Sequence, residues 1–188
     1  MPLFLVRHGE TRLSGTFCGS SNPPLNAHGR AQAAAAARCL SRFSFDYAYI
    51  SPLRRVQETA AIIRHRSNVS LVTRLALREI HFGIWEGRSF QEIDKKSPGL
   101  SRRWLQDPTT VRIPQAESFA SLRRRTRRFL SVITPRMVRE NVLVVAHGGT
   151  NSAIILQLLG LPDTEFRKQI QPLASVRMID GRKMKTLC

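Results

Sequence analysis

The sequence predicts an α/β fold, a three-layer α/β/α sandwich with a mostly parallel central sheet and an antiparallel edge. Short apolar runs alternate with helical stretches along the 188 residues, as expected for a parallel sheet covered by helices on both faces. The most apolar runs, 3–6 and 142–146, each lead into a histidine, His8 and His147. The last two runs are joined by Asp180-Gly181, which suits a hairpin turn and predicts the antiparallel edge.

The other elements follow in order along the chain. Helices are predicted at 31–40, 53–66, 117–137 and 151–159, and further strands at 45–50, 71–73, 173–179 and 183–187. Asn26 suits the N-cap of the first helix, whose body is rich in alanine. Pro52 suits the first turn of the second helix, and Pro135 should bend or end the third. Tryptophans and prolines interrupt the periodicity between 77 and 114, so we expect an irregular segment there.

Length and composition predict one domain that covers residues 1–188. A chain of this length with 42% hydrophobic residues can form one good core and is short for two. The residues before Arg7 lack the basic region of a signal peptide, and no run reaches the ~18 apolar residues of a membrane helix. We therefore expect a soluble, cytoplasmic protein with no membrane partner. The sequence does not indicate an oligomeric state.

Charge and cysteine usage narrow the chemistry further. Three widely spaced cysteines, Cys18, Cys39 and Cys188, form no Cys-x-x-Cys pair, which argues against structural disulfides and against zinc. The formal net charge of +17 predicts an anionic ligand or surface. We interpret the arginine-rich run 123–128 as the solvent-exposed face of a helix that turns Leu122 and Phe129 inward, because it lacks interleaved aromatic residues for stacking on bases.

The residues that follow the predicted strands indicate phosphoryl transfer. A neutral imidazole such as that of His8 is a nucleophile toward phosphorus, and the neighbouring Arg7 can contact two phosphoryl oxygens at once. Arg55 lies in Ser51-Pro52-Leu53-Arg54-Arg55, where a helix N-terminus would add backbone N–H groups for an anion. Two guanidinium groups repel a metal cation and attract a phosphate, so we expect neither a metal nor another cofactor.

Two further groups complete this predicted site. Departure of an alkoxide from phosphorus needs a proton donor, and Glu79 is the candidate, with Glu86 and Glu10 as nearby alternatives. His147 and the backbone of Gly148 would hold the phosphoryl oxygens. The alternative for His147 is a purely structural role, as a hydrogen-bonded histidine of the core.

Five ordered blocks resemble the motifs of the histidine phosphatase superfamily, also called the phosphoglycerate-mutase-like family. They are Leu5 to Thr11, Ser51 to Arg55, Glu79 to Gly87, Glu117-Ser118, and Ala146 to Gly149, and together they span nearly the whole chain. The resemblance implies that His8 is phosphorylated during the reaction, and that Glu79 is the general acid that later activates water. It also implies that Arg7, Arg55 and His147 bind the phosphate, without a metal.

Departures from the family pattern lie in the loop after the first strand. Ser14 stands where many members have an asparagine, and we expect it to contact the phosphate. Cys18 stands where many have a threonine, so Cys18 and Gly19 are predicted to belong to a loop that selects the substrate.

We therefore expect a metal-independent phosphomonoesterase that acts on a small, anionic phosphorylated metabolite, similar to the branch that holds α-ribazole phosphatases. The short 87–116 segment and the pair Gly148-Gly149 argue against the first alternative, a phosphoglycerate-type mutase. The second alternative is a binding protein that has kept the pocket and uses its basic surface for nucleic acid or an acidic partner. Nucleic acid is not the partner we expect, although the basic charge does not exclude it.

Overall fold

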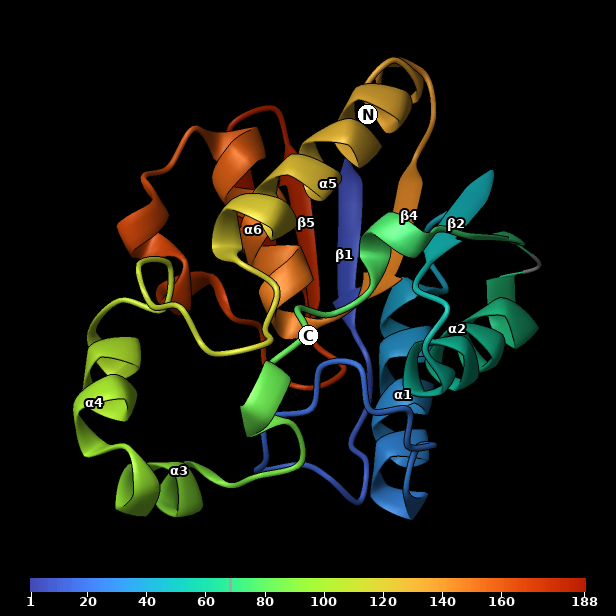
Figure 1. The fold of residues 1–188 in the computed structure, drawn as a ribbon. Coiled ribbons are helices and arrows are strands. Elements are labelled where there is room, and N and C mark those ends of the chain that lie inside the picture. The colour runs from blue at the N-terminus through green and yellow to red at the C-terminus, as the bar shows by residue number, and fades with distance from the viewer. Residues whose placement is uncertain (68) are drawn as a thin grey trace.

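A computed structural model describes residues 1–67 and 69–188, which form a six-stranded sheet between two layers of helices (Figure 1). The strands are β1 (Leu3–Arg7), β2 (Tyr47–Ile50), β3 (Ser70–Thr73), β4 (Val142–Ala146), β5 (Val176–Asp180) and β6 (Lys183–Thr186). Their order is β3-β2-β4-β1-β5-β6; the first four are parallel to one another, and β5 and β6 are antiparallel to their neighbours. The predicted fold class is confirmed.

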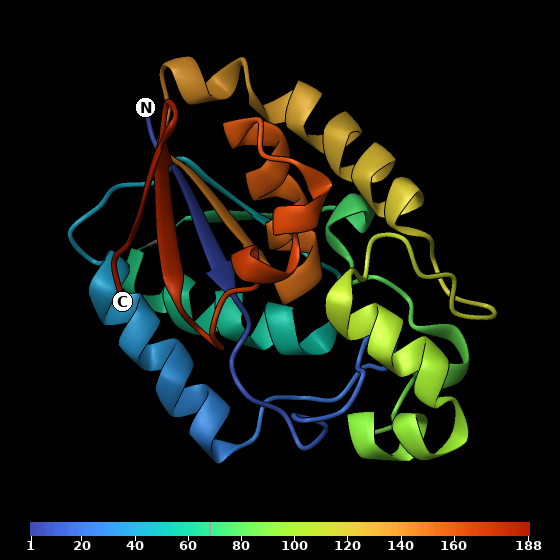
Figure 2. The ribbon, with the colours of Figure 1, turned by 90° about the vertical axis from the view of Figure 1, so that its left-hand side faces the viewer.

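Each face of the sheet is covered by its own pair of helices, as the turned view in Figure 2 shows. The helices are α1 (Ala27–Leu40), α2 (Arg54–Ser67), α3 (Phe90–Lys96), α4 (Pro98–Gln106), α5 (Phe119–Ile133) and α6 (Gly148–Leu159). Successive side chains of a strand point to opposite faces. In β1, Phe4 and Val6 therefore pack under α1 and α2, whereas Leu3 and Leu5 pack under α5 and α6.

The segment predicted to be irregular contains two helices. α3 begins at a capping box in which Ser89 and Glu92 exchange hydrogen bonds, and α4 begins with Pro98 in its first turn, where proline is well tolerated. The expectation of an irregular 77–114 segment was therefore wrong for 90–106, because these prolines and serines start helices instead of breaking them. Figure 1 shows α3 and α4 standing apart from the sheet, on the side toward which β1 runs.

The ends of the remaining helices follow local signals. Asn26 caps α1 by accepting a hydrogen bond from the backbone N–H of Gly29 at 2.7 Å, as predicted, although the helix already begins at Ala27. α5 ends before Pro135, and α6 ends at Gly160, which adopts a left-handed conformation with φ 67°. None of the helices in the described ranges is long and apolar enough to cross a membrane.

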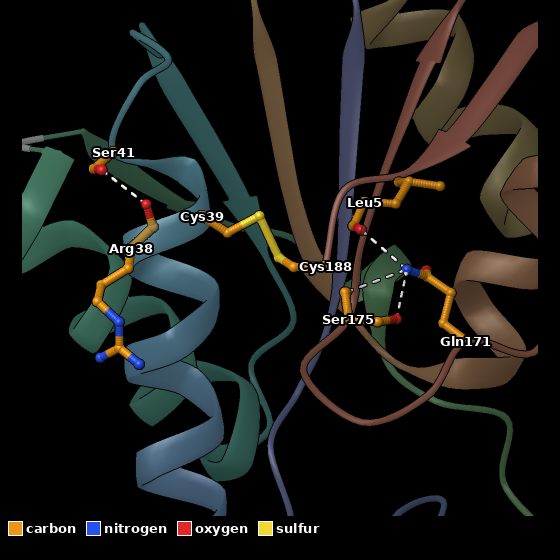
Figure 3. The surroundings of a disulfide bond; sticks show 7 residues. All are labelled: Leu5, Arg38, Cys39, Ser41, Gln171, Ser175 and Cys188. Atoms are coloured by element: carbon orange, nitrogen blue, oxygen red, sulfur yellow. Dashed lines mark hydrogen bonds between the residues drawn. A yellow bond between two sulfur atoms is a disulfide. The ribbon is translucent and has the colours of Figure 1, made fainter.

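The cysteine expectation was wrong in one respect. Cys39 of α1 and Cys188 form a disulfide, with their Cα atoms 6.6 Å apart (Figure 3). They are separated by 149 positions in sequence, so spacing gave no hint of the pair. The fold joins them because Cys188 follows the edge strand β6 and its carbonyl accepts a hydrogen bond from the N–H of Val176.

The arginine run of α5 is only partly solvent-exposed. Leu122 and Phe129 are buried, as expected. Arg125, however, forms an ion pair with Glu117 at 2.8 Å, and both side chains are more than four-fifths buried. Arg123 pairs with Asp163. The prediction of one solvent-exposed face therefore holds for Arg124, Arg127 and Arg128 and is wrong for Arg125.

Candidate active site

The sheet brings His8 and His147 together. β1 and β4 are neighbours in register, with Arg7 opposite Ala146, so the residues that follow both strands leave the sheet side by side. The centroids of the two imidazole rings are 5.1 Å apart. Parallel strands present their carboxyl ends at one edge of the sheet, which is where ligands of open α/β sheets bind.

The loop after β1 can leave the sheet tightly because of two glycines. A Cβ atom on Gly9 would lie 2.3 Å from the carbonyl oxygen of Gly29, and a Cβ on Gly29 would lie 2.1 Å from that of Glu10. The backbone of α1 therefore touches the backbone next to His8. The N–H of Gly9 also donates to Thr59 Oγ1 at 3.2 Å, which ties the same loop to α2.

The hydrogen bonds of His8 indicate which of its nitrogens is free to react. Nδ1 lies 2.7 Å from the carbonyl oxygen of Gly9, which can only accept, so Nδ1 carries the proton. Nε2 therefore has the lone pair, and it accepts a hydrogen bond from Arg55 Nε at 3.2 Å. Burial, and after it the charge of Arg55, holds the pKa of His8 well below its ordinary value, which keeps the ring neutral and nucleophilic.

His147 is oriented by Ser51, whose Oγ lies 2.8 Å from Nε2. Ser51 Oγ also accepts from the N–H of Leu53 and so can donate its own hydrogen to Nε2, which leaves the ring proton on Nδ1. Nδ1 is buried and has no hydrogen-bond partner. The pKa of His147 is held well below its usual range by burial and by the charge of Arg55.

Arg7 also has an unpaired donor at this place. Its Nη1 donates to the carbonyl of Gln171 at 2.6 Å, but its buried Nε has no partner. The guanidinium lies against the start of α6, since a Cβ on Gly148 would lie 3.3 Å from Arg7 Cζ. Burial lowers the pKa of Arg7, and the Glu79 carboxylate offsets part of that effect.

Gln171 holds this corner in place, as Figure 3 shows in part. Its side chain, which is completely buried, donates to the carbonyl of Leu5 at 3.1 Å and accepts from Asn151 Nδ2 at 2.8 Å. One residue thus links β1, α6 and the guanidinium of Arg7. Gln171 was not predicted as a site residue, because it lies outside the five blocks that resemble the family.

Arg55 lies behind His8 and is completely buried. Besides its contact with His8, it donates from Nη1 to the carbonyl of Ser21 at 2.6 Å and from Nη2 to the carbonyls of Cys18 and Gly19 at 3.1 and 2.9 Å. Burial lowers its pKa, partly offset by the neighbouring acidic groups. Arg55 therefore connects the candidate nucleophile to the loop that was predicted to select the substrate.

Glu79 lies at the N-terminus of α6. Its two carboxylate oxygens accept hydrogen bonds from the N–H groups of Gly149 at 3.0 Å and Thr150 at 3.1 Å. Gly149 leaves room for this contact, because a Cβ there would lie 2.8 Å from Glu79 Oε1. The first turn of a helix stabilises a negative charge at such a position.

Glu86 has a different task from Glu79. It accepts hydrogen bonds from the N–H groups of Gly19, Ser20 and Phe82 and from the hydroxyl of Ser21, all within 3.2 Å. Burial alone would raise the pKa of Glu86, but these hydrogen bonds outweigh it and lower the pKa. Glu86 therefore fixes the loop whose carbonyls bind Arg55.

Glu10, the other alternative acid, points elsewhere. One of its carboxylate oxygens accepts from Asn26 Nδ2 at 2.7 Å, at the start of α1. Of the three carboxylates considered from sequence, only Glu79 lines the same cavity as His8.

A cavity of about 480 Å³ opens in front of His8. Arg7, His8, Glu79, Gly148 and Gly149 line one end, which we call the phosphate end. Most of the remainder is lined by apolar side chains, which we call the apolar wall: Leu13, Phe17, Phe82, Phe90, Trp104, Leu105, Pro108, Phe119, Phe166, Ile170 and Leu173. Polar residues, among them Thr11, Thr16 and Arg167, also line the cavity. The wall was not predicted, because its residues come from segments that are far apart in sequence and show no common period.

The other predicted site residues divide between the cavity and its support. Ser14 lines the cavity, with its hydroxyl oxygen accepting from the N–H of Thr11, and Cys18 lines it with a half-buried thiol. Burial raises the pKa of Cys18, so the thiol stays protonated. Gly19, Arg55 and His147 are not among the residues that line the cavity, but Arg55 and His147 lie next to His8, which does line it.

No group of three or more His, Cys, Asp or Glu residues in the described part of the chain is arranged to hold a metal ion. The cationic and neutral donors around His8, namely Arg7, Arg55 and His147, instead suit an anion.

The chain resembles known phosphatases in sequence. The pattern of the family described as "Histidine phosphatase superfamily (branch 1)" matches residues 3–187. Phosphoserine phosphatase 1 of Hydrogenobacter thermophilus is 34% identical over 166 residues, which cover 87% of this chain and 79% of that protein. The adenosylcobalamin/alpha-ribazole phosphatase of Escherichia coli is 31% identical over 164 residues, covering 86% and 81%.

Solved structures agree with the sequence matches. A structure of mycobacterial glucosyl-3-phosphoglycerate phosphatase with VO3 superposes with a TM-score of 0.88 at 26% identity, covering 98% of this chain and 96% of that one. The alpha-ribazole phosphatase of Shigella flexneri superposes with a TM-score of 0.85 at 27% identity, covering 99% and 94%.

Proposed function

The chain belongs to the histidine phosphatase superfamily, and from that premise we propose that it is a metal-independent phosphomonoesterase that works through a phosphohistidine on His8. The observation that carries the proposal is the set of atoms around His8 Nε2. The lone pair of this nitrogen is free of a proton, and two buried donors beside it, Arg7 Nε and His147 Nδ1, have no partner. A phosphoryl group would satisfy both.

In the first step, His8 Nε2 attacks phosphorus and the bond to the ester oxygen breaks. Glu79 protonates the departing alkoxide, so a neutral alcohol leaves. Before the reaction, Arg55 Nε–H donates a hydrogen bond to His8 Nε2. As the N–P bond forms, this N–H must donate to a phosphoryl oxygen instead. Arg7 and His147 hold the other phosphoryl oxygens, which carry the negative charge.

In the second step, water attacks the phosphohistidine. Glu79, which is now a carboxylate, takes a proton from that water, the N–P bond breaks, and inorganic phosphate leaves with His8 restored. Ser14 and Gly148 also line the cavity, and the hydroxyl of Ser14 and the backbone of Gly148 would make further phosphate contacts.

The proposal is tested by labelling the protein with 32P and comparing quenches in base and in acid. Wild-type protein mixed with a 32P-labelled monoester and quenched in base should carry label on His8, since phosphohistidine survives base and is lost in acid. His8→Asn should carry none and should lose at least about 10³-fold in turnover. Full activity of His8→Asn would overturn the proposal.

A product analysis distinguishes hydrolysis of the phosphoester from transfer of its phosphoryl group. With 3-phosphoglycerate as the donor, a phosphatase releases inorganic phosphate, whereas a mutase returns an isomeric phosphoglycerate with little release. Measuring both products therefore distinguishes the proposal from the mutase alternative.

A further inference from the structure

We propose that the alcohol part of the substrate is a bulky, uncharged, apolar group of about the size of an aromatic ring system, which the apolar wall holds. This inference rests on the proposed phosphomonoesterase function and names the substrate class of that site. It makes small charged monoesters, such as phosphoserine or a phosphorylated sugar acid, the poorer substrates.

The size of the cavity supports this substrate class. About 480 Å³ lies within the range of sites that enclose a drug-sized ligand. The phosphate end takes up one end of that space, with Arg7, His8 and Glu79 around it. The remaining volume belongs to the alcohol part, and a group as small as a serine side chain would leave most of it empty.

The chemistry of the wall supports an apolar occupant. Phe82, Phe90 and Trp104 are only half-buried, so part of each ring faces the cavity. Apolar area that stays exposed inside a concave site gains favourable free energy when a ligand covers it. A polar sugar acid would cover it without that gain and would lose its own hydration.

The charges that line the cavity argue against a positively charged alcohol part, such as that of an amino acid. Among the described residues that line it, Glu79 is the only carboxylate, and the phosphate end already uses it. Arg167 is the remaining cation, and its Nη1 donates to the backbone carbonyl of Leu105. The ammonium group of phosphoserine would therefore lie in the cavity without a free carboxylate partner.

The aromatic side chains of the wall pack against one another. Phe17 packs edge to face against Phe82 and Trp104, with ring centroids 5.1 and 4.9 Å apart, and against the buried ring of Trp85 at 5.1 Å. Phe119 packs in the same manner on Phe166, at 5.0 Å. Rings that are held by such contacts have few alternative conformations to lose on binding, so their contacts with a ligand contribute to selectivity.

The first test compares monoesters with similar primary alkoxide leaving groups. We expect kcat/KM for 2-phenylethyl phosphate and 2-(2-naphthyl)ethyl phosphate to exceed that for ethyl phosphate by about tenfold or more, and that for O-phosphoserine by a larger factor. Equal or higher kcat/KM for ethyl phosphate or O-phosphoserine would overturn the inference and leave the proposed function intact. Hydrolysis of none of the four esters would overturn the proposed function itself.

The second test changes the wall. Leu105→Asn and Leu13→Asn place an amide in the cavity at half-buried positions, and Val132→Asn makes the same change on the exposed side of α5. Each wall variant should lower the ratio of kcat/KM between 2-phenylethyl and ethyl phosphate about tenfold, whereas Val132→Asn should keep the wild-type ratio. Because ethyl phosphate turnover reports a folded protein, an unchanged ratio in both wall variants would contradict the inference.

Discussion

The two ends of the cavity are built in different ways. The phosphate end comes from the end of β1, from His8 after it, from Glu79 and from the first turn of α6, and hydrogen bonds orient its side chains. The apolar wall comes from the loop after β1, from α3 and α4, from the start of α5, and from residues on either side of the short turn at Arg167–Gln169. The sheet therefore fixes the reacting groups, whereas segments outside the sheet shape the space for the alcohol part of the substrate.

The difference predicts that changes at the phosphate end act on every substrate, and changes in the wall act on the choice among substrates. In the proposed complex, Arg7 and His8 contact the phosphoryl group that all monoesters share. Leu13 and Leu105 contact the alcohol part, in which the esters differ. The following experiments test this division, beginning with the largest effect.

Glu79→Gln should show the largest selective loss. The amide cannot supply the proton, so kcat for 2-phenylethyl phosphate should fall by about 10²- to 10⁴-fold. p-Nitrophenyl phosphate, whose leaving group needs no proton, should still phosphorylate His8 and give a burst of one p-nitrophenol per protein, followed by slow turnover. Stopped-flow absorbance measures the burst, and Glu140→Gln, at a partly exposed carboxylate that does not line the cavity, is the control. Equal losses with both esters in the burst phase would argue against Glu79 as the acid.

Arg7→Ala should lower kcat/KM by about 10²- to 10³-fold, because one charge-stabilising donor is lost. The loss should be the same for ethyl and 2-phenylethyl phosphate. Arg124→Ala, which removes an exposed guanidinium from α5, serves as the control and should keep the wild-type rate. A loss confined to one of the two esters would contradict the division between the ends of the cavity.

Removal of the disulfide should lower the stability of the fold without affecting either end of the cavity. Cys39→Ser combined with Cys188→Ser opens a loop of 149 residues and should lower the free energy of unfolding by about 2–4 kcal/mol. The kcat/KM values of both esters should not change, because neither cysteine lines the cavity. Urea unfolding with and without a reductant measures the effect; in the double variant the reductant should have none. A reductant-insensitive wild type would show that the disulfide does not contribute.

The smallest effect concerns pH. The pKa of His8 is lower in the folded chain than in the unfolded chain, so only the unfolded chain takes up this proton as the pH falls below about 6.5. The contribution of His8 to the free energy of unfolding is therefore complete above that pH and is lost as the pH falls below it. Between pH 6 and pH 5, His8→Asn should lose about 1 kcal/mol less unfolding free energy than the wild type. His28→Asn, at an exposed position, should behave as the wild type does; identical losses in all three proteins would contradict the lowered pKa.

Most of the phosphate end could be predicted from the sequence. Arg7, His8 and His147 follow runs whose apolar character identifies buried strands, and parallel pairing then places their ends together. Asn26 and Gly160 could be recognised as helix ends because their conformational preferences act locally. The sequence alone did not select Glu79 as the general acid, because only the fold distinguishes it from Glu10 and Glu86.

The wall, Gln171 and the disulfide could not be predicted, because each depends on contacts between distant segments. Phe17, Trp104 and Phe166 have no common period, and α3 and α4 begin at serine and proline residues that resemble loop signals. The partner of Cys39 could be found only once β6 and α1 were placed in space.

The in-register pairing of β1 and β4 has a consequence for how such a gene can change in length. Inserting one codon within either strand would shift its side chains to the opposite face and move His8 relative to His147 by a residue. Codons added around α3 and α4 leave that pairing untouched and alter only the wall. Insertions and deletions that distinguish related genes should therefore accumulate in the segments around α3 and α4, which determine substrate selectivity. They should be absent from β1 and β4, which position the reacting groups.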